Sequence, residues 1–271
     1  MTEFGPADAR PWIAVPGPDD DKYSRGVVGF VTGSARYPGA AVLGVDAALH
    51  TGVGMVRYLG PGRPTRLVLQ RRPEAVTAEG RVQAWVIGSG QDPENRDDEL
   101  LGRALAQDVP VVIDGGALDR VRDAVGPAIL TPHAGELARL LGVERADIVA
   151  DPDGTAERAA REFDATVLLK GHVSRIASPE GLRHRVTAPT TWLATAGSGD
   201  ALAGILGALV ATHPRGDLAD LAATACVLHG LAGERASRGG PFTILDLCAQ
   251  LPAAIAALLV SSAEGGGLLV E

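Results

Sequence analysis

The segment at positions 194–200 has residue types and a spacing that suit chemistry on a phosphate group. It reads Ala-Thr-Ala-Gly-Ser-Gly-Asp, and the apolar run Ala201–Gly204 follows it directly. Where small residues lead into an apolar helix, the first backbone N–H groups of that helix stay open at the positive end of its dipole. Glycines let a phosphate come close to the backbone. We therefore predict a phosphate-binding helix start at Gly197–Asp200.

Asp200 permits two interpretations. An aspartate at a helix start is a favoured N-cap, whose carboxylate accepts hydrogen bonds from backbone N–H groups. Alternatively, it is a general base directed at a substrate hydroxyl beside the phosphate. The glycine pattern itself argues against three familiar sites. The chain has no Walker phosphate loop, no G-x-G-x-x-G after a predicted strand and no G-x-S-x-G nucleophile turn.

The elements that must position this segment alternate between short apolar runs and longer helical patterns. Such alternation is typical of a mostly parallel central sheet with helices on both faces, so we predict an α/β fold. Two further strands, at 175–177 and 184–187, are expected to form an antiparallel hairpin at an edge of the sheet. The other predicted strands are 27–31, 53–59, 85–87, 111–113, 128–130 and 166–169, and the predicted helices are 40–50, 97–107, 155–163, 200–212, 218–237 and 244–260.

Several predicted strands end at a glycine or a polar residue. In parallel α/β sheets the carboxyl ends of the strands line the ligand crevice, although turn chemistry alone also places polar residues there. Lys170 is therefore either a surface lysine or a phosphate contact, and His133 either a hydrogen-bonded residue before a helix or a substrate contact. The strand-end residues are Thr32, Gly88, Asp114, Thr131 and Lys170.

Charge and apolar patterning argue against several other classes of protein. The net charge is −8, and the four arginines of Arg63–Arg72 are expected to be solvated surface rather than a nucleic-acid-binding face. No apolar run is long enough to predict a membrane span, and the N-terminal sequence lacks the apolar region of a signal peptide. Cys226 and Cys248 lack zinc-ligand spacing, so we expect buried thiols, a reducing compartment and a cytoplasmic location.

We expect a single domain over residues 23–262. Hydrophobic residues make up 46% of the chain, which is ample for a buried core, and no Pro- or Ser-rich linker divides it. Residues 1–22 are rich in Pro, Gly and Asp and predict a loose N-terminal arm. Residues 263–271 predict a frayed tail.

Five segments together resemble the ADP-dependent NAD(P)H-hydrate dehydratases, a family with the ribokinase-like fold. Their order and spacing match over roughly residues 22–260 of this chain. The combination of Thr-Pro-His-Ala-Gly-Glu with Ala-Gly-Ser-Gly-Asp is the most specific part of the match. The five segments are Lys22–Gly26, Thr32–Ala41, Leu130–Glu136, Leu169–Gly171 and Ala194–Gly204.

This resemblance implies repair of NADH or NADPH that has been hydrated at the nicotinamide ring. In the family, a nucleotide, typically ADP in prokaryotes, phosphorylates the added hydroxyl of the S epimer. Phosphate then leaves with a ring proton, so that the products are NAD(P)H, AMP and phosphate. Asp200 would be the base that takes the hydroxyl proton.

The resemblance also implies which residues contact each ligand. Magnesium is expected to accompany the nucleotide phosphates, but no protein ligand for it can be named from the sequence. The residues implied for nucleotide binding are Lys170, Gly171, His172, Val173, Ser174, Gly197, Ser198 and Gly199, and those implied for binding hydrated NAD(P)H are Ala40, Gly90, His133 and Asp200.

The expected partners are small molecules, namely the hydrated dinucleotide and ADP, with no nucleic acid and no membrane. The resemblance implies a homotetramer. Some relatives carry an N-terminal epimerase domain, for which an arm of 22 residues leaves no room, so we expect a separate NAD(P)H-hydrate epimerase to act with this chain.

Three stretches depart from the family pattern. Gly116 stands where relatives often have a second acid, Gly88–Asp92 reads Gly-Ser-Gly-Gln-Asp where Gly-Pro-Gly-Leu-Gly is usual, and Thr190–Trp192 replaces a Gly-Asn-Pro-Gly-like run. Trp192 either stacks on a ligand ring or packs. Two alternatives therefore stay open: a small-molecule kinase of the same fold, of hydroxyethylthiazole-kinase type, and a nucleotide-sensing protein without turnover.

Overall fold

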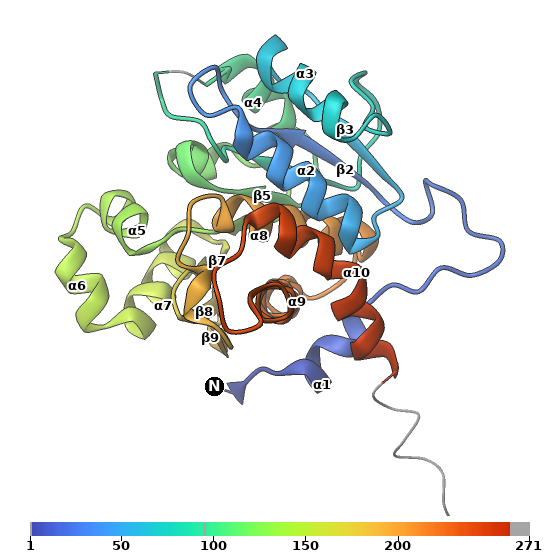
Figure 1. Cartoon of the computed structure of the whole chain (residues 1–271). Helices are drawn as coiled ribbons and strands as arrows, with labels where there is room; N and C mark the ends of the chain where they lie inside the picture. Colours follow the sequence, from blue (N-terminus) through green and yellow to red (C-terminus); the bar gives the residue numbers. More distant parts are fainter. Residues whose placement is uncertain (1, 95, 261–271) are drawn as a thin grey trace, which may run out of the picture.

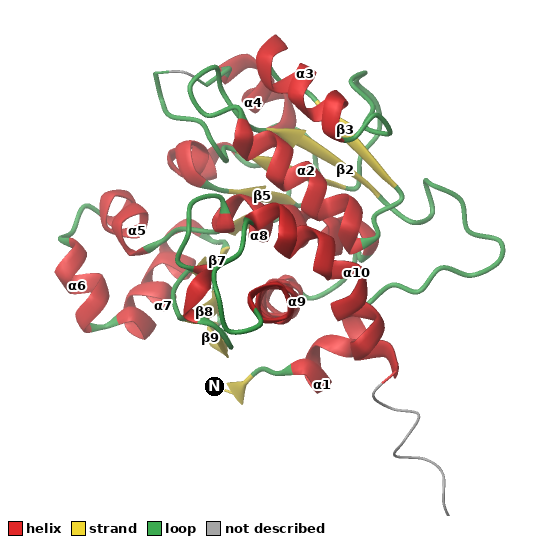
Figure 2. Ribbon diagram, in the orientation of Figure 1, coloured by secondary structure: helices red, strands yellow, loops and turns green. Residues whose placement is uncertain are grey.

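The described strands form one sheet in the order β1-β9-β8-β7-β6-β5-β4-β2-β3 (Figure 2). The computed structural model of the protein describes residues 2–94 and 96–260. Neighbouring strands are parallel except at β8, which is antiparallel to both β7 and β9. The strands are β1 (Thr2–Glu3), β2 (Val27–Val31), β3 (Met55–Tyr58), β4 (Ala84–Ile87), β5 (Val111–Ile113), β6 (Ala128–Leu130), β7 (Thr166–Leu169), β8 (Val173–Ser178) and β9 (Gly181–Thr187).

Helices connect most of these strands and complete the chain after β9 (Figure 1). Short 3-10 helices lie at Arg10–Trp12 (η1), Gly115–Asp123 (η2) and Thr191–Leu193 (η3). The α-helices are α1 (Pro6–Ala9), α2 (Gly39–Thr51), α3 (Gly62–Arg71), α4 (Asp98–Leu105), α5 (Ala134–Leu141), α6 (Arg145–Ala150), α7 (Pro152–Phe163), α8 (Ser198–Thr212), α9 (Leu218–Ser237) and α10 (Ile244–Val260).

Alternate residues of each strand pack into two separate cores, one on each face of the sheet. In β2, Val28 and Phe30 pack with α2, α8, α9 and α10, whereas Val27 and Val31 pack on the face covered by α4, α5 and α7. Side chains of a strand point alternately to its two faces, so a fully apolar strand requires cover on both sides. The structure thus confirms the predicted mostly parallel sheet with helices on both faces.

Glycines let helix α8 pack unusually close to α2. A Cβ atom placed on Gly204 would lie 2.2 Å from the backbone oxygen of Gly44, so no side chain fits at this contact. The first residues of α8 lie at the carboxyl edge of the sheet, because Gly199 faces Lys170, the residue that follows β7. The close contact with α2 therefore fixes where the predicted phosphate-binding segment sits.

The first half of the predicted loose arm is instead docked on the domain. Strand β1 pairs with β9, Phe4 is buried at 7% exposure, and the ring of Trp12 lies 6.0 Å from that of His213. The physical reason is that β9 offers an unpaired edge, which β1 covers. The β8–β9 hairpin forms as predicted, but β1 rather than β9 is the outermost strand there. The predicted tail, 263–271, lies outside the described residues.

The arginine stretch is corrected at its end, because Arg72 is only 21% exposed and both it and Arg71, which is 42% exposed, pair with a buried carboxylate. The Nε atoms of Arg71 and Arg72 lie 3.0 and 2.5 Å from Oδ1 of Asp46, which is fully buried in α2. A buried carboxylate is costly unless it is paired, and these ion pairs with α3 and its C-cap supply the partners.

Within residues 2–94 and 96–260, no helix is long and apolar enough to cross a membrane.

Candidate active site

Helix α8 begins after a left-handed backbone turn that favours glycine. Gly197 is the N-cap residue with a φ of 89°, and Asp200 is the third residue of the helix. The N-cap residue of α8 is thus Gly197 and not Asp200. The interpretation of Asp200 as an N-cap is therefore wrong, and its side chain is available for another role.

The environment of Asp200 makes its carboxylate unusually basic. Burial, with smaller contributions from the negative charges of Asp114 and Glu136, outweighs the attraction of Lys170 and raises the pKa of Asp200 to about 7. A carboxylate with such a pKa can take a proton at neutral pH far more readily than a solvated one. The position suits a general base.

Lys170 is held at the end of β7 by carboxylates from two other elements. Its Nζ donates to Oδ1 of Asp114 at 2.8 Å and lies 3.7 Å from Oε2 of Glu136. Burial lowers the pKa of Lys170, but the two carboxylates raise it by more, so the group is a cation. The side chain is only 18% exposed, so Lys170 is not a surface lysine.

Asp114 is the centre of a hydrogen-bond network built from successive strand ends. Besides Lys170, it accepts hydrogen bonds from the hydroxyl of Thr131 at 2.8 Å and from that of Ser89 at 2.9 Å. Burial raises the pKa of Asp114, but Lys170 and the two hydroxyls lower it by more, so it stays ionised. The predicted convergence of polar strand ends is confirmed for Asp114, Thr131 and Lys170.

A cavity of about 570 Å³ opens beside this network, over the ends of β7, β8 and β9 and the starts of α8 and η3. Its volume is within the usual range for small-molecule sites. Of the predicted residues, His133, Lys170, Gly171, His172, Ser174, Ser198 and Gly199 line it; Val173, Gly197, Ala40, Gly90 and Asp200 do not. Most of the predicted nucleotide contacts therefore share one cavity.

Gly199 brings the start of α8 against Lys170. A Cβ atom at Gly199 would lie 3.4 Å from Nζ of Lys170. The N–H of Ser198 donates to the oxygen of Thr195 at 3.3 Å, whereas the next amides of a first helical turn have no partner within the helix. An anion held here would meet the helix start and the lysine together.

His133 is placed at the rim of the same cavity by two contacts. It is the N-cap of α5, and its Nδ1 accepts from the N–H of Glu136 at 3.0 Å while Glu136 accepts from the N–H of His133. The backbone N–H of Lys170 donates to the oxygen of Pro132 at 2.8 Å. His133 is 56% exposed at its side chain, so it is both a cap and accessible to a ligand.

Ala40 and Gly90 lie against each other, outside the cavity. Gly90 has a φ of 65°, and a Cβ there would be 2.3 Å from Cβ of Ala40 and 2.9 Å from the oxygen of Tyr37. Close packing alone explains why both residues are small. Their contact with a substrate remains a prediction.

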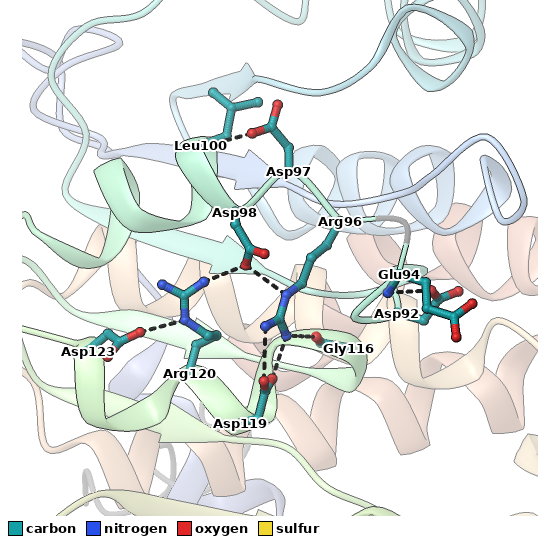
Figure 3. A network of polar contacts seen from close by, with 10 residues as sticks. All are labelled: Asp92, Glu94, Arg96, Asp97, Asp98, Leu100, Gly116, Asp119, Arg120 and Asp123. Carbon is teal, nitrogen blue, oxygen red and sulfur yellow. Dashed lines mark hydrogen bonds and ion pairs between the residues drawn. The ribbon is translucent and has the colours of Figure 1, made fainter.

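Two of the departures from the family pattern, Gly116 and the loop Gly88–Asp92, lie against each other. A Cβ at Gly116 would lie 2.1 Å from the backbone oxygen of Gln91, so the glycine loop occupies the space that an acid would need. Nη1 of Arg96 donates to the oxygen of Gly116 at 2.7 Å and to Asp119 (Figure 3).

Trp192, on η3, is 46% exposed and so is not packed in the core.

His229 is a site residue that sequence reasoning missed. It lies on α9, lines the cavity, and its Nε2 is 3.1 Å from Oγ of Ser198. Burial lowers the pKa of His229 to about 4, so the ring is neutral. The available signal was one histidine within the apolar run 219–233.

The described residues provide no preformed metal site. No group of three or more His, Cys, Asp or Glu side chains in that part of the chain is arranged to hold a metal ion. The carboxylate of Asp114 is already paired with Lys170, Thr131 and Ser89. The donor set does not fit a resident divalent cation.

The fold is that of the ribokinase-like α/β proteins. A ribokinase-like superfamily protein of Enterococcus faecalis superimposes on the chain with a TM-score of 0.84 at 22% identity, covering 95% of this chain and 96% of its own. Within that class, the chain belongs to the NAD(P)H-hydrate dehydratase family, whose family model matches residues 28–248.

Named relatives agree with this assignment. The chain is 36% identical to the ADP-dependent (S)-NAD(P)H-hydrate dehydratase of Xanthomonas campestris, over 90% of this chain and 92% of the relative. The crystal structure of the Bacillus subtilis ADP/ATP-dependent NAD(P)H-hydrate dehydratase, co-crystallised with ATP/Mg²⁺, superimposes with a TM-score of 0.84 at 25% identity, covering 94% and 98% of the two chains.

Other relatives are longer proteins. The chain is 44% identical to the bifunctional NAD(P)H-hydrate repair enzyme of Mycobacterium tuberculosis, over 80% of this chain but 47% of that enzyme. The chain thus spans about half the length of these bifunctional relatives.

Proposed function

We propose that this chain catalyses the ADP-dependent dehydration of hydrated NADH or NADPH, acting on the S epimer. The hydroxyl of the hydrated ring attacks the terminal phosphoryl group of ADP, which forms an O–P bond and releases AMP. The phosphate then leaves the ring with its bonding electrons while a ring proton is lost, which restores the double bond of NAD(P)H. Every atom is supplied by the dinucleotide and ADP.

The observation that carries this proposal is the unpaired, half-buried carboxylate of Asp200 in the first turn of α8, next to the Lys170–Asp114 ion pair. With a pKa of about 7, Asp200 takes the hydroxyl proton as the O–P bond forms. Lys170 and the open amides at the start of α8 stabilise the negative charge of the migrating phosphoryl group.

The cavity of about 570 Å³ is assigned to ADP, with the phosphates at Lys170, Gly171, Ser198 and Gly199 and the remainder toward His172 and Ser174. His133, Ala40 and Gly90 are assigned to the hydrated dinucleotide. The match of these positions to the family motifs supports the assignment, and only His133 also faces the cavity.

Magnesium enters this proposal as part of the nucleotide substrate. The phosphates of ADP chelate the magnesium ion in solution. In the complex the ion is expected to keep these phosphate ligands and several water ligands, as is usual for this cation. No step is assigned to a metal ion bound by the protein.

The homotetramer and the epimerase partner are supported by family resemblance and chemistry. Because the activity is restricted to one epimer, an NAD(P)H-hydrate epimerase must supply that epimer from the other. A cytoplasmic location is supported by the two free, buried cysteines and by the substrates, which are intracellular metabolites.

The direct test mixes the protein with hydrated NADH and ADP or ATP and follows the absorbance of restored NADH. Recovery with ADP is expected. A small-molecule kinase would give a phosphorylated product with no recovery of NADH, and absence of recovery with either nucleotide would contradict the proposal.

The variant Asp200→Asn tests the assigned base. It should bind ADP nearly as well as the parent but turn over at least about a hundredfold more slowly, as expected for the loss of a general base. Asp217→Asn is the matched control, because Asp217 is a true N-cap, of α9, and accepts from the N–H groups of Ala219 and Asp220. Equal turnover in both variants would show that Asp200 is not the base.

A further inference from the structure

Two buried polar side chains in the wall of the cavity beside Lys170 contact each other between two helices. Ser198 is the first residue of α8 and His229 lies on α9, and both residues line the cavity. They are 9% and 8% exposed. Nε2 of His229 lies 3.1 Å from Oγ of Ser198. The proposed reaction places Ser198 at the phosphates of ADP but gives no role to its hydroxyl group or to His229.

The hydroxyl group is the donor that Ser198 can offer to a ligand. Its backbone N–H already donates to the oxygen of Thr195 at 3.3 Å. Within the described part of the chain, Oγ of Ser198 has no hydrogen-bond partner other than His229. A hydroxyl group has one proton to donate and two lone pairs that accept. Where the proton of Ser198 points therefore depends on which of the two residues donates the hydrogen bond between them.

His229 is the donor of this hydrogen bond. Burial lowers the pKa of His229 to about 4, so the neutral ring carries a single N–H. The ring also has a hydrogen bond with the backbone of Ser198, which acts against this lowering of the pKa. Such an effect requires the ring to donate, because a hydrogen bond donated by the ring favours its charged form. We therefore assign the proton to Nε2, which leaves the hydroxyl proton of Ser198 for another acceptor.

The cavity provides a place for an anionic acceptor next to this hydroxyl group. Lys170 lines the same cavity, and a Cβ atom on Gly199, the residue after Ser198, would lie 3.4 Å from Nζ of Lys170. A phosphate group held by the lysine and the start of α8 would therefore lie beside Ser198. A hydrogen bond to a charged acceptor is stronger than one between neutral groups. The geometry thus favours a phosphate oxygen as the acceptor.

We propose that His229 positions the hydroxyl group of Ser198 for the proposed reaction. Nε2–H of His229 donates to Oγ, and the hydroxyl proton is directed at a phosphate oxygen of ADP. His229 is a positioning residue that acts through Ser198, whereas Ser198 contacts the nucleotide. Both side chains are neutral, so the pair adds a hydrogen-bond donor at the phosphate without adding a charge beside Lys170. This inference rests on the assignment of the cavity to ADP in the proposed function.

Nucleotide binding tests this inference without turnover. Calorimetry on the full chain compares ADP with adenosine, which lacks the phosphates. Ser198→Ala should weaken ADP binding at least about tenfold, as expected for the loss of a hydrogen bond to a charged group, and adenosine binding less than about twofold. His229→Leu leaves the hydroxyl free to rotate, so it should weaken ADP binding by about threefold to tenfold with the same small effect on adenosine.

A rescue and a double variant separate positioning from packing. His229→Gln should bind ADP within about twofold of the parent, because the side-chain amide of glutamine can also donate an N–H to Oγ. His229→Leu combined with Ser198→Ala should bind ADP no more weakly than Ser198→Ala alone, because His229 acts through the hydroxyl group that is then absent.

Cys226→Ala is the matched control, since Cys226 lies on α9 three residues before His229, lines the same cavity and is also 8% exposed. It should change the affinities for ADP and adenosine by the same factor. Equal losses for the two ligands in His229→Leu, or additive losses in the double variant, would overturn the inference even if hydrate repair is observed. A selective loss of ADP binding without hydrate repair would support it and contradict only the proposed reaction. A parent protein that does not bind ADP would overturn both.

Discussion

At the scale of single residues, two carboxyl groups close to one lysine have pKa values that are shifted in opposite directions. Asp114 is paired with Lys170 and two hydroxyls, and its pKa is held below the usual value. Asp200 lacks such partners, and burial raises its pKa to about 7. Pushing the pKa values of neighbouring carboxyls apart separates their roles: Asp114 keeps Lys170 charged, and the proposed role of Asp200 is to accept a proton.

This separation predicts the pH dependence of the reaction. Asp200 must be ionised to act as a base, so kcat/KM should rise with pH through a midpoint near 7 and level off above it. Steady-state rates between about pH 5 and 9 measure this limb. His133→Asn is the control, because asparagine also caps a helix and the change removes the imidazole of His133 from the cavity wall. The midpoint should stay in place in that variant, and a midpoint below about 5 would show that Asp200 is not buried as described.

At the scale of elements, the chemistry depends on where one helix starts. Gly197 allows the sharp turn into α8, and the contact between Gly204 and Gly44 presses α8 against α2. On the other side, His229 of α9 holds the hydroxyl of Ser198. The start of α8 is thus fixed by neighbours on both sides, which is the preorganisation that phosphoryl transfer requires.

Two glycine-to-alanine changes should therefore have opposite effects on stability. Gly204→Ala forces a Cβ against the backbone of α2 and should lower the free energy of unfolding by about 1–3 kcal/mol, the usual cost of overpacking. Gly102→Ala in α4 has no atom within 4 Å of the new Cβ and should raise it by up to about 1 kcal/mol, because alanine favours helix. Urea denaturation measures both. A Gly204→Ala protein as stable as the parent would show that the two helices are not in tight contact.

At the scale of the whole molecule, the site occupies the carboxyl edge of one continuous sheet. The cavity beside Lys170 lies over β7, β8 and β9, and a second cavity, lined by Gly33, Gly60 and Gln91, lies further along that edge towards β3. The N-terminal segment closes the end of the sheet that lies next to β9. Strand β1 covers β9, and the ring of Phe4 lies 4.8 Å from that of His184.

The docked N-terminal segment should contribute to global stability. Phe4→Ala removes a buried ring and should lower the free energy of unfolding by about 3 kcal/mol, as is usual for truncating a buried aromatic residue. Val15→Ala is the control, because Val15 is 65% exposed and should change stability by less than about 0.5 kcal/mol. Equal thermal and urea midpoints in the two variants would mean that the segment is loosely attached.

The sequence by itself determined the class of fold and the centre of the site. Apolar runs that alternate with helical patterns require a sheet covered on both faces, and the described helices α8, α9 and α10 agree closely with the predicted ranges. The role of glycines before an apolar helix can be predicted from the sequence, because backbone freedom and the open N–H groups of a helix start depend on a few adjacent residues. Gly197–Asp200 could therefore be identified without coordinates.

The properties that depend on contacts between residues distant in the sequence, namely burial, pKa and ion pairing, were decided only by the tertiary structure. How basic Asp200 is, whether Lys170 is buried and which carboxylate is paired depend on groups far apart in the chain, such as Asp114 and Glu136. The docked N-terminal segment, the role of His229 and the arginines bound to Asp46 were likewise hidden, because burial and the pairing of charges are properties of neighbours in space.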